Sequence, residues 1–437
     1  MGGGTLQLVI TGGADIHIIG NPETSFFKSV YRRHTNFSIE CIEQIRMGTI
    51  TNRDFKLTYN IVHSGDLLNK MHFEIDLPEQ EMNSNQPEGY CSYSNNTAYC
   101  FIKDVSIYIG DKLIDKHDGR YFDIMNELNH KDGSGIDYLI NRHSGGVEHI
   151  PSPSATKLYV PLHFWFCKDE SQSLPIIALQ YHDVRIVVNF RGINKIIQSE
   201  GASVSGTSIN DPNKPNIKLW GNFFHLDVDE RKRFVKNHHE YLIEQVQTIQ
   251  TDYRNYINLS LNHPVKCIYW VIQNNEVLKE KTDYKNIDYL KNVYGNVDST
   301  EINNRWYNGN DYLNYKTHEI VNPSTLYGDI VYEHFDKMTL LFNGIERFKR
   351  RDGTYFRTLQ PIENHYTIPN KNIYMYSFCL NPEQHQPSGV CNFSRIDNFS
   401  INFTGDQLYD NYTFILYAKN YNILRIMEGM AGVLYAN

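Results

Sequence analysis

Alternating apolar and polar residues recur along the chain. The run Met71–Leu77 places an apolar side chain at every second position, which is typical of a strand with one face in a core and one face in water. Similar runs occur at Phe55–Ile61 and Val265–Val271. A fourth run, Met338–Phe342, leads directly into Asn343-Gly344, whose residues tolerate positive φ and therefore predict a tight hairpin.

Helical periodicity is scarce by comparison. The best candidates are short stretches near Tyr121–Leu128 and Tyr355–Leu359. Many short antiparallel strands with few helices predict an all-β fold, either a sandwich or a barrel.

Two collinear sequence matches indicate that one β-domain is used twice. A strand, a tight turn and a second strand lead to Asp118–Phe122, and the same order leads to Asp352–Phe356, 234 residues further on. Both segments read Asp-Gly-x-Tyr-Phe. The second match pairs Phe166-Cys167 with Phe378-Cys379, and Asn189-Phe190 with Asn402-Phe403. Two matches in the same order favour duplication over coincidence.

The segments between these patterns predict a linker and two large loops. Residues Gly201–Pro215 are rich in Ser, Gly, Asn and Pro, as surface loops are. We place the linker between the halves near Arg231–His238. The polar stretch Gln273–Asn322 is much longer than its counterpart in the first half, so we expect an enlarged exposed loop on the second domain.

Composition agrees with this organisation and narrows the function. A chain of 437 residues is longer than a domain with one hydrophobic core usually is, so we expect at least two domains. The aromatic content of 13% favours β-structure. With 42 Lys+Arg against 50 Asp+Glu, the net charge of −8 argues against a dedicated duplex-DNA binder. Seven scattered cysteines without CxxC spacing make a disulfide framework or zinc knuckle improbable. No apolar run is long enough to predict a membrane span.

The sequence carries no recognisable catalytic, cofactor-binding or metal-binding motif. His238 and His239 are adjacent and would point to opposite faces of a strand, so they cannot share a metal. Gly2–Gly4 is not followed by Lys-Ser/Thr or by an expected helix, which favours a flexible arm over a phosphate-binding loop. We therefore expect no enzyme activity and no cofactor.

Two further motifs have surface interpretations. The basic run Arg347–Arg351 places Phe348 inward and its neighbours outward, which favours an edge strand or subunit contact over a nucleic-acid strip. Seven Asn-x-Ser/Thr triplets occur, but several lie in segments with a strand pattern. Only Asn95, which we expect in a loop, is a suitable glycosylation acceptor. Structural assembly, carbohydrate binding and host-factor binding remain open as function classes.

Several longer segments resemble one protein family. They are Gly20–Phe37, Leu179–His182, Asp229–Phe234, His239–Gln245, Gln386–Gly389, Asn392–Asn398, Tyr421–Met427 and Gly429–Gly432. On these segments the chain resembles the double jelly-roll major capsid proteins of large nucleocytoplasmic DNA viruses, in their shorter chlorella-virus type. The resemblance spans nearly the whole chain but not Gln273–Asn322, so features of the outer surface are not transferred.

The resemblance implies a fold and an assembly. It implies two consecutive eight-stranded antiparallel jelly-roll barrels with a few short helices in loops: an N-terminal arm at 1–25, a first jelly roll at 26–234 and a second at 235–437. Three chains would then form a pseudo-hexagonal homotrimer that tiles an icosahedral shell, assembled in the host cytoplasm. A minor capsid or vertex paralogue is the alternative, and a carbohydrate-binding jelly roll is a more distant one.

The resemblance also implies roles for parts of the chain. The arm would run beneath the barrels, with an assembly anchor formed by Asn21, Pro22, Phe26, Phe27, Tyr31, Arg32 and Arg33. Expected partners are other copies of the chain within and between trimers, minor capsid and penton proteins, and the inner viral membrane at the underside. Surface glycans are also expected, whereas a specific nucleic acid is not.

Overall fold

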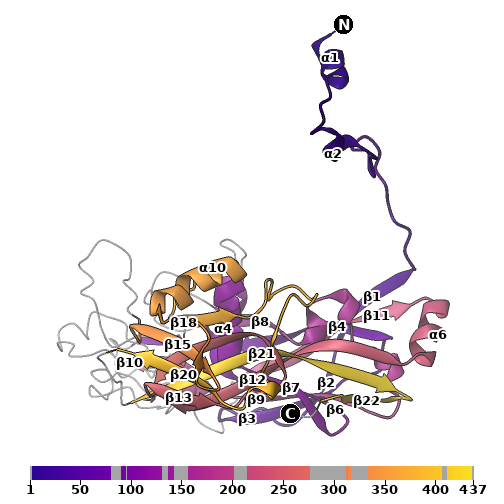
Figure 1. Ribbon diagram of the computed structural model, residues 1–437. Coiled ribbons are helices and arrows are strands. Elements are labelled where there is room, and N and C mark those ends of the chain that lie inside the picture. The colour runs from indigo at the N-terminus through magenta and orange to yellow at the C-terminus, as the bar shows by residue number, and fades with distance from the viewer. Residues whose placement is uncertain are drawn as a thin grey trace. The chain divides into compact units, whose positions relative to one another are not determined.

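The computed structural model describes residues 2–79, 90–94, 96–129, 136–141, 156–200, 214–275, 312–313, 315, 333–405 and 411–435. The chain divides into two compact units, Met1–Phe37 and Ser38–Asn437. The first unit contains two short helices, α1 (Gly3–Val9) and α2 (Ile16–Ile19), and neither buries a residue. The second unit holds the β-structure (Figure 1).

The expectation that no helix follows the N-terminal glycines is wrong, because α1 begins at Gly3. The glycines lie in the first turn, where the backbone N–H groups have no partner within the helix in any case. The following Thr-Leu-Gln-Leu-Val segment completes the local hydrogen bonds, ending with the amide of Ile10 donating to the Leu6 carbonyl at 3.1 Å.

The first half of the second unit forms two antiparallel sheets. One has the strand order β1 (Phe37–Glu43), β11 (Asn216–Leu226), β4 (Leu67–Leu77), β8 (Thr156–Pro161). The other has the order β2 (Ile45–Met47), β3 (Phe55–Asn60), β9 (Val184–Phe190), β6 (Ile102–Ile109), β7 (Lys112–Asp118). A small additional sheet pairs β5 (Tyr90–Tyr93) with β10 (Ile197–Glu200).

The second half repeats this plan. Its first sheet has the order β12 (His239–Asp252), β21 (Tyr412–Met427), β14 (Pro264–Asn274), β18 (Ile373–Ser377), with β19 (Cys391–Asn392) and β22 (Met430–Val433) beside it. Its second sheet has the order β13 (Tyr256–Leu259), β20 (Phe399–Thr404), β15 (Lys337–Phe342), β16 (Ile345–Glu346), and β17 (Arg351–Asp352) also pairs with β15. The same strand order in both halves confirms the predicted pair of jelly rolls.

The helices are short and lie between strands. In the described part of the second unit the helices are α3 (Thr97–Phe101), α4 (Gly119–Asn129), α5 (Ile136–Ile140), α6 (Val228–Lys236), the π-helical turn η5 (Tyr355–Leu359) and α10 (Gln360–Asn364). The 3₁₀ turns there are η1 (Trp165–Cys167), η2 (Glu170–Gln172), η3 (Ile176–Ala178), η4 (Ile193–Lys195) and η6 (Phe393–Arg395). Both predicted helical stretches are confirmed. The expected linker consists mostly of α6, whose N-cap residue Asp227 accepts a hydrogen bond from the Val228 amide.

The duplicated Asp-Gly-x-Tyr-Phe segments occupy the same place in each barrel. In the first barrel the β6–β7 hairpin ends at Asp118 and α4 begins at Gly119. In the second barrel β17 ends at Asp352 and η5 begins at Tyr355. The predicted hairpin at Asn343-Gly344 is also confirmed, since both residues have positive φ (50° and 81°) and Phe342 pairs with Ile345.

The sheet β12-β21-β14-β18 lies between two hydrophobic clusters. On β14, Cys267 and Tyr269 belong to the cluster of the first barrel, while Ile268 and Trp270 belong to that of the second. The alternating pattern correctly predicts one buried face and one more exposed face for β4. In the centre of β14, by contrast, both faces are buried. Its outward side is covered because it packs against the first barrel.

The predicted large loops fall mostly outside the described residues. The described part of Gln273–Asn322 includes Tyr312, Leu313 and Tyr315, which are all buried. The expectation of an exposed loop is therefore wrong at these three positions. Tyr312 is held by the guanidinium of Arg191, 4.6 Å from its ring centre, and by the Gln273 side-chain amide, which donates to its carbonyl at 2.7 Å.

Candidate assembly surfaces

The two barrels contact each other through strand β7 and strand β12. The backbone amide of Val246 on β12 donates to the Asp115 carboxylate on β7 at 3.0 Å, and the Gln245 side chain donates to the Ile114 carbonyl. One residue before α4, Asp118 accepts a hydrogen bond of 2.7 Å from the Tyr417 hydroxyl on β21. The hairpin of the first barrel thus covers the first strand of the second barrel.

Helix α4 adds a second set of contacts between the barrels. Lys371 forms an ion pair with Asp123 at 2.8 Å, and the Thr367 hydroxyl donates to the Glu127 carbonyl at 2.8 Å. Both partners on α4 are buried. The segment after α10 therefore fixes α4 against the second barrel.

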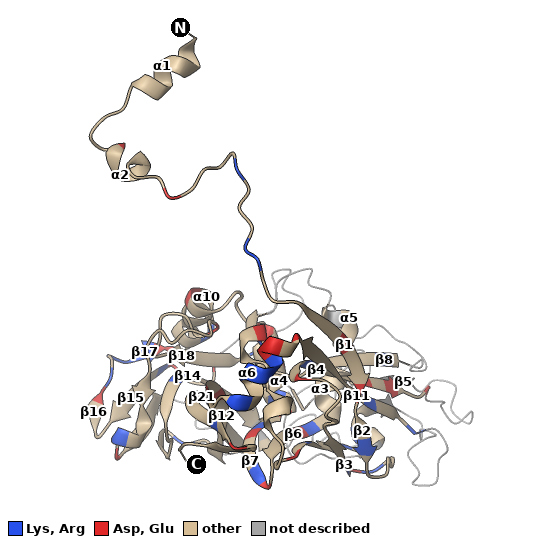
Figure 2. Ribbon diagram, turned by 90° about the vertical axis from the view of Figure 1, so that its right-hand side faces the viewer, with Lys and Arg blue, Asp and Glu red and all other residues tan. Residues whose placement is uncertain are grey.

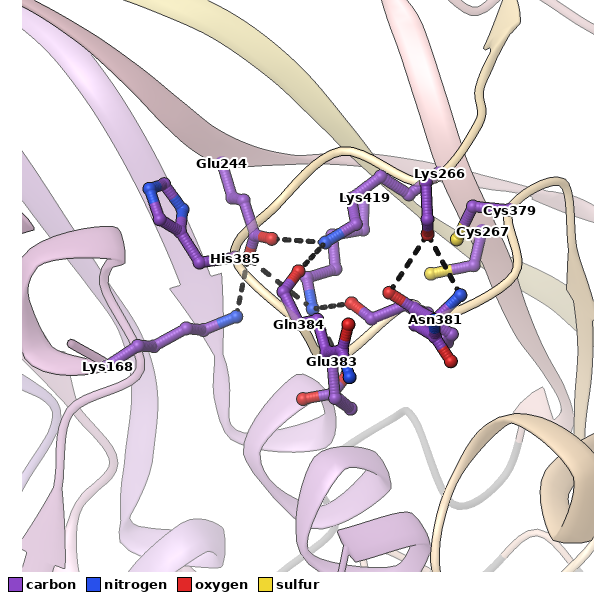
Figure 3. A network of polar contacts seen from close by, with 12 residues as sticks. Lys168, Glu244, Lys266, Cys267, Cys379, Asn381, Glu383, Gln384, His385 and Lys419 are labelled. Atoms are coloured by element: carbon purple, nitrogen blue, oxygen red, sulfur yellow. Dashed lines mark hydrogen bonds and ion pairs between the residues drawn. The ribbon is translucent and has the colours of Figure 1, made fainter. Parts of the chain in front are cut away.

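A cluster of three lysines and two glutamates lies at the same boundary (Figure 3). Glu244 of β12 is central: its Oε1 lies 2.5 Å from Lys266 Nζ, and its Oε2 lies 2.6 Å from Lys168 Nζ and 3.4 Å from Lys419 Nζ. Glu383 pairs with Lys419 at 3.1 Å. We call these five residues the lysine–glutamate cluster. Lys168 comes from the first barrel and the other four come from the second.

The two glutamates of the cluster are ionised, because the neighbouring lysines offset the cost of burying their negative charge. Burial alone would raise the pKa of Glu383, but the charges of Lys419 and Lys168 lower it to about 2. Burial would likewise raise the pKa of Glu244, yet the neighbouring lysines hold it well below its usual range. Against the effect of burial, Glu244 and Glu383 raise the pKa of Lys419 well above its usual value. Burial lowers the pKa of Lys168, the one lysine of the cluster from the first barrel, so Lys419 is the most firmly protonated partner of the two carboxylates.

The sequence predictions missed the lysine–glutamate cluster. Its members are scattered over 252 positions, from Lys168 to Lys419, and enter from separate strands and loops. One signal was present, since Lys266 and Lys419 are single lysines within apolar strands, and their side chains are 0% and 1% exposed. A buried lysine needs a nearby carboxylate, but the sequence does not identify which one.

Two of the segments that carry the family resemblance meet at another point between the barrels. The Tyr181 amide donates to the Gly429 carbonyl at 3.0 Å, and the Ala431 amide donates to His182 Nδ1 at 3.1 Å. Gly429 has φ of +81°, and a Cβ there would lie 2.7 Å from the Tyr181 ring. The β21–β22 turn therefore requires glycine at this position.

The predicted anchor residues lie in the N-terminal unit and are exposed in the single chain. Phe26 and Phe27 are 98% and 99% exposed, and Tyr31 is 82% exposed. Asn21 adopts positive φ (50°), is separated from the end of α2 by Gly20, and is followed by Pro22. The unit exposes further apolar residues that sequence reasoning did not single out: Leu6, Leu8, Val9, Ile10, Ile16, Ile18, Ile19 and Val30.

The guanidinium groups of the anchor are also exposed. Arg32 and Arg33 make no ion pair within the residues that the structure describes. A segment with this many exposed apolar and cationic side chains has the composition of a contact surface.

The remaining predicted sites have no counterpart or cannot be placed. Asn95 lies outside the described residues. Within the described ranges, no group of three or more His, Cys, Asp or Glu side chains could hold a metal ion. No helix in the described part of the chain is long and apolar enough to cross a membrane.

Comparisons with known proteins match both halves of the chain. The family model "Major capsid protein N-terminus" matches residues 25–227, and "Large eukaryotic DNA virus major capsid protein" matches residues 230–432. The chain is 34% identical to the major capsid protein of Pyramimonas orientalis virus and 32% identical to that of Paramecium bursaria Chlorella virus 1, with 100% of each chain covered.

A solved structure agrees with the sequence comparisons. The fold matches PBCV-1 VP54 with a TM-score of 0.72 and 29% identity, over 94% of this chain and 100% of that one. The duplicated jelly roll, the family-model matches and the full-length relatives lead to one conclusion. The chain belongs to the family of major capsid proteins of large eukaryotic DNA viruses.

Proposed function

We propose that the chain is the repeated shell subunit of an icosahedral virion and that it associates as a homotrimer. The observation that carries this proposal is the presence of two barrels with the same strand order in one chain. Three such chains supply six similar barrels, which suit a ring with pseudo-sixfold symmetry. The relatives named as major capsid proteins, one of them with a structure of the same fold, support this role.

The contacts between the barrels support a rigid building block. The lysine–glutamate cluster, the α4 contacts and the β7–β12 contact all join the two barrels within one chain. We infer a structural role without catalysis. We also propose the arm at 1–25, the first barrel at 26–234 and the second at 235–437, which the family-model ranges support.

The N-terminal arm would extend these contacts to other components of the virion. Phe26, Phe27 and Tyr31 would insert beneath a barrel, and Arg32 and Arg33 would pair with carboxylates across an interface. Asn21 and Pro22 would set the direction of the chain at that point. Neighbouring capsomers, minor capsid and penton proteins, and the inner viral membrane are the proposed partners, with glycans on the outer surface and assembly in the host cytoplasm.

The native mass of the purified protein tests the proposal. One chain has a mass of 51.0 kDa, so a trimer should give three times that value, about 153 kDa, by light scattering. Obligate interfaces bury enough surface for the trimer to persist at micromolar concentration. A mass of one chain over the whole accessible concentration range would overturn the proposal.

A further inference from the structure

The contact between the two barrels of one chain offers a template for the contact between two chains. In the first barrel, the contacting groups on β7 are the Ile114 carbonyl and the Asp115 carboxylate. Gly110 and Asp118, which bracket β7, each recur 234 residues later as Gly344 and Asp352.

Counted back from the shared Asp118 and Asp352, each contacting residue has a counterpart, although the arm after the turn is one residue longer in the second hairpin (Ile345–Asp352 against Lys112–Asp118). Ile114 corresponds to Phe348, and Asp115 corresponds to Lys349. The basic run Arg347–Arg351 of the second barrel therefore corresponds to the part of β7 through which the first barrel contacts β12.

In the second barrel this hairpin, Ile345–Asp352, is exposed. Ile345 is 74% exposed, and Arg347, Lys349, Arg350 and Arg351 are all exposed. The Asp352 side chain is 72% exposed, whereas its counterpart Asp118 is 21% exposed beneath Tyr417. Figure 2 shows the blue of Lys and Arg along the chain between β16 and β17.

Strand β1 is the matching surface on the first barrel. Like β12 in the second barrel, β1 is the first strand of its barrel and the outermost strand of its sheet; β1 lies beside β11, and β12 lies beside β21. The centre of β12, Ile243–Gln245, is buried. By contrast, β1 is almost wholly exposed: Ile39 is 58% exposed, and Glu40 and Glu43 add negative charge.

We propose that the hairpin Ile345–Asp352 of one chain docks on β1 of a second copy, as β7 docks on β12 within a chain. The basic hairpin complements Glu40 and Glu43 on β1, and Ile345 and Ile39 supply apolar surface. The contact is head-to-tail, so repeating it three times closes a ring of six barrels. The inference rests on the proposed capsomer and deepens it by naming the surfaces that join its subunits.

Charge reversal in the full-length protein tests this contact. Glu40→Lys with Glu43→Lys, or Lys349→Glu with Arg350→Glu, should each raise the concentration needed for trimer formation by about tenfold or more. The four substitutions combined should restore the trimer, because the charges are then exchanged. All four side chains are exposed, so the chain should still fold.

A matched control reverses the same number of basic residues in the first barrel. Lys112→Glu with Lys116→Glu alters exposed side chains on β7, which faces the chain's own second barrel, and should leave the native mass at about 153 kDa (three times 51.0). Reversal variants that remain trimeric would overturn the contact and leave the capsomer standing. A wild-type protein that stays monomeric would overturn the capsomer and the contact with it.

A second measurement does not depend on substitutions. Cys41 on β1 is exposed in the single chain. In the trimer a thiol reagent should label Cys41 at least about tenfold more slowly than in the dissociated Glu40→Lys, Glu43→Lys variant, as read by peptide mass spectrometry. Equal labelling rates would overturn the docking of β1.

Discussion

At the scale of single residues, the lysine–glutamate cluster shows how charge is accommodated between two apolar cores. Lys266 and Lys419 are almost completely buried, and each lies within 3.5 Å of a glutamate oxygen. A buried ion pair of this kind is weak evidence of net stabilisation, but the loss of one partner is costly because it leaves an uncompensated charge. Glu244 contacts all three lysines, so it is the sensitive position.

We expect Glu244→Gln to lower the free energy of unfolding by about 3–5 kcal/mol, because three ammonium groups lose their common partner. Urea denaturation of purified protein would measure the change. The matched control is Glu240→Gln on the same strand, since Glu240 is 57% exposed and pairs with Arg425 at the surface. The control substitution should lower the free energy of unfolding by less than about 1 kcal/mol. Equal effects of the two substitutions would contradict this account of the cluster.

The lowered pKa of Glu383 predicts a dependence of stability on acid pH. Its folded pKa of about 2 lies below the ordinary value of 4.5, so the unfolded chain binds this proton first as the pH falls. The stabilisation is present above pH 4.5 and is lost as the pH falls towards 2. Glu383→Gln should remove up to about 1.4 kcal/mol per pH unit from the slope in this window. Denaturation at a series of pH values measures it, and an unchanged slope would argue against the assignment.

At the scale of elements, the sequence pattern predicts the strands and turns whose conformation depends on a few neighbouring residues. The alternation at Met71–Leu77 and the Asn343-Gly344 turn are confirmed because strand pleat and turn conformation are decided within a few residues. The second buried face of β14 was not predictable in this way. The residues that cover this face of the sheet come from the other barrel, as Tyr121 does where it lies beside Tyr417 of the neighbouring strand β21. Tertiary contacts across hundreds of residues leave no periodic signal.

The β21–β22 turn allows a sharp test at this scale. Gly429→Ala should destabilise the protein by about 1–3 kcal/mol, because alanine disfavours the positive φ and its Cβ would collide with Tyr181. Gly432→Ala is the control, since no atom lies within 4 Å of the added Cβ and φ is not positive there. Differential scanning calorimetry of both variants would compare them. A larger loss for Gly432→Ala would contradict the role given to this turn.

At the scale of the whole molecule, the N-terminal unit differs from the barrels in that its helices bury nothing. The sequence resemblance pointed to an anchor in this unit. It could not show what the proposed anchor would bind, because a partner surface leaves no signal in this sequence. Under the proposed function, the exposed aromatic residues would bear on assembly rather than on the stability of the barrels.

Replacing Phe26 and Phe27 by serine in the full-length protein separates these two effects. We expect the melting temperature of the barrels to stay within about 2 °C of the wild-type value, since both side chains are almost fully exposed. Formation of assemblies larger than the capsomer should fall several-fold, as followed by sedimentation velocity. Arg53→Ser, at an exposed position before β3, serves as a control. A drop in melting temperature with normal assembly would reverse the proposed role.

The placement of charge also has a consequence for how a shell of this protein would come apart. Dissolved ions screen exposed charges strongly and buried ones weakly. The lysine–glutamate cluster lies inside the subunit, whereas Glu40, Glu43 and Arg347–Arg351 lie on its surface. Concentrated salt would therefore weaken the contacts between subunits, while the contacts between the two barrels of each subunit persist. Dilution of the salt would then allow the subunits to reassemble.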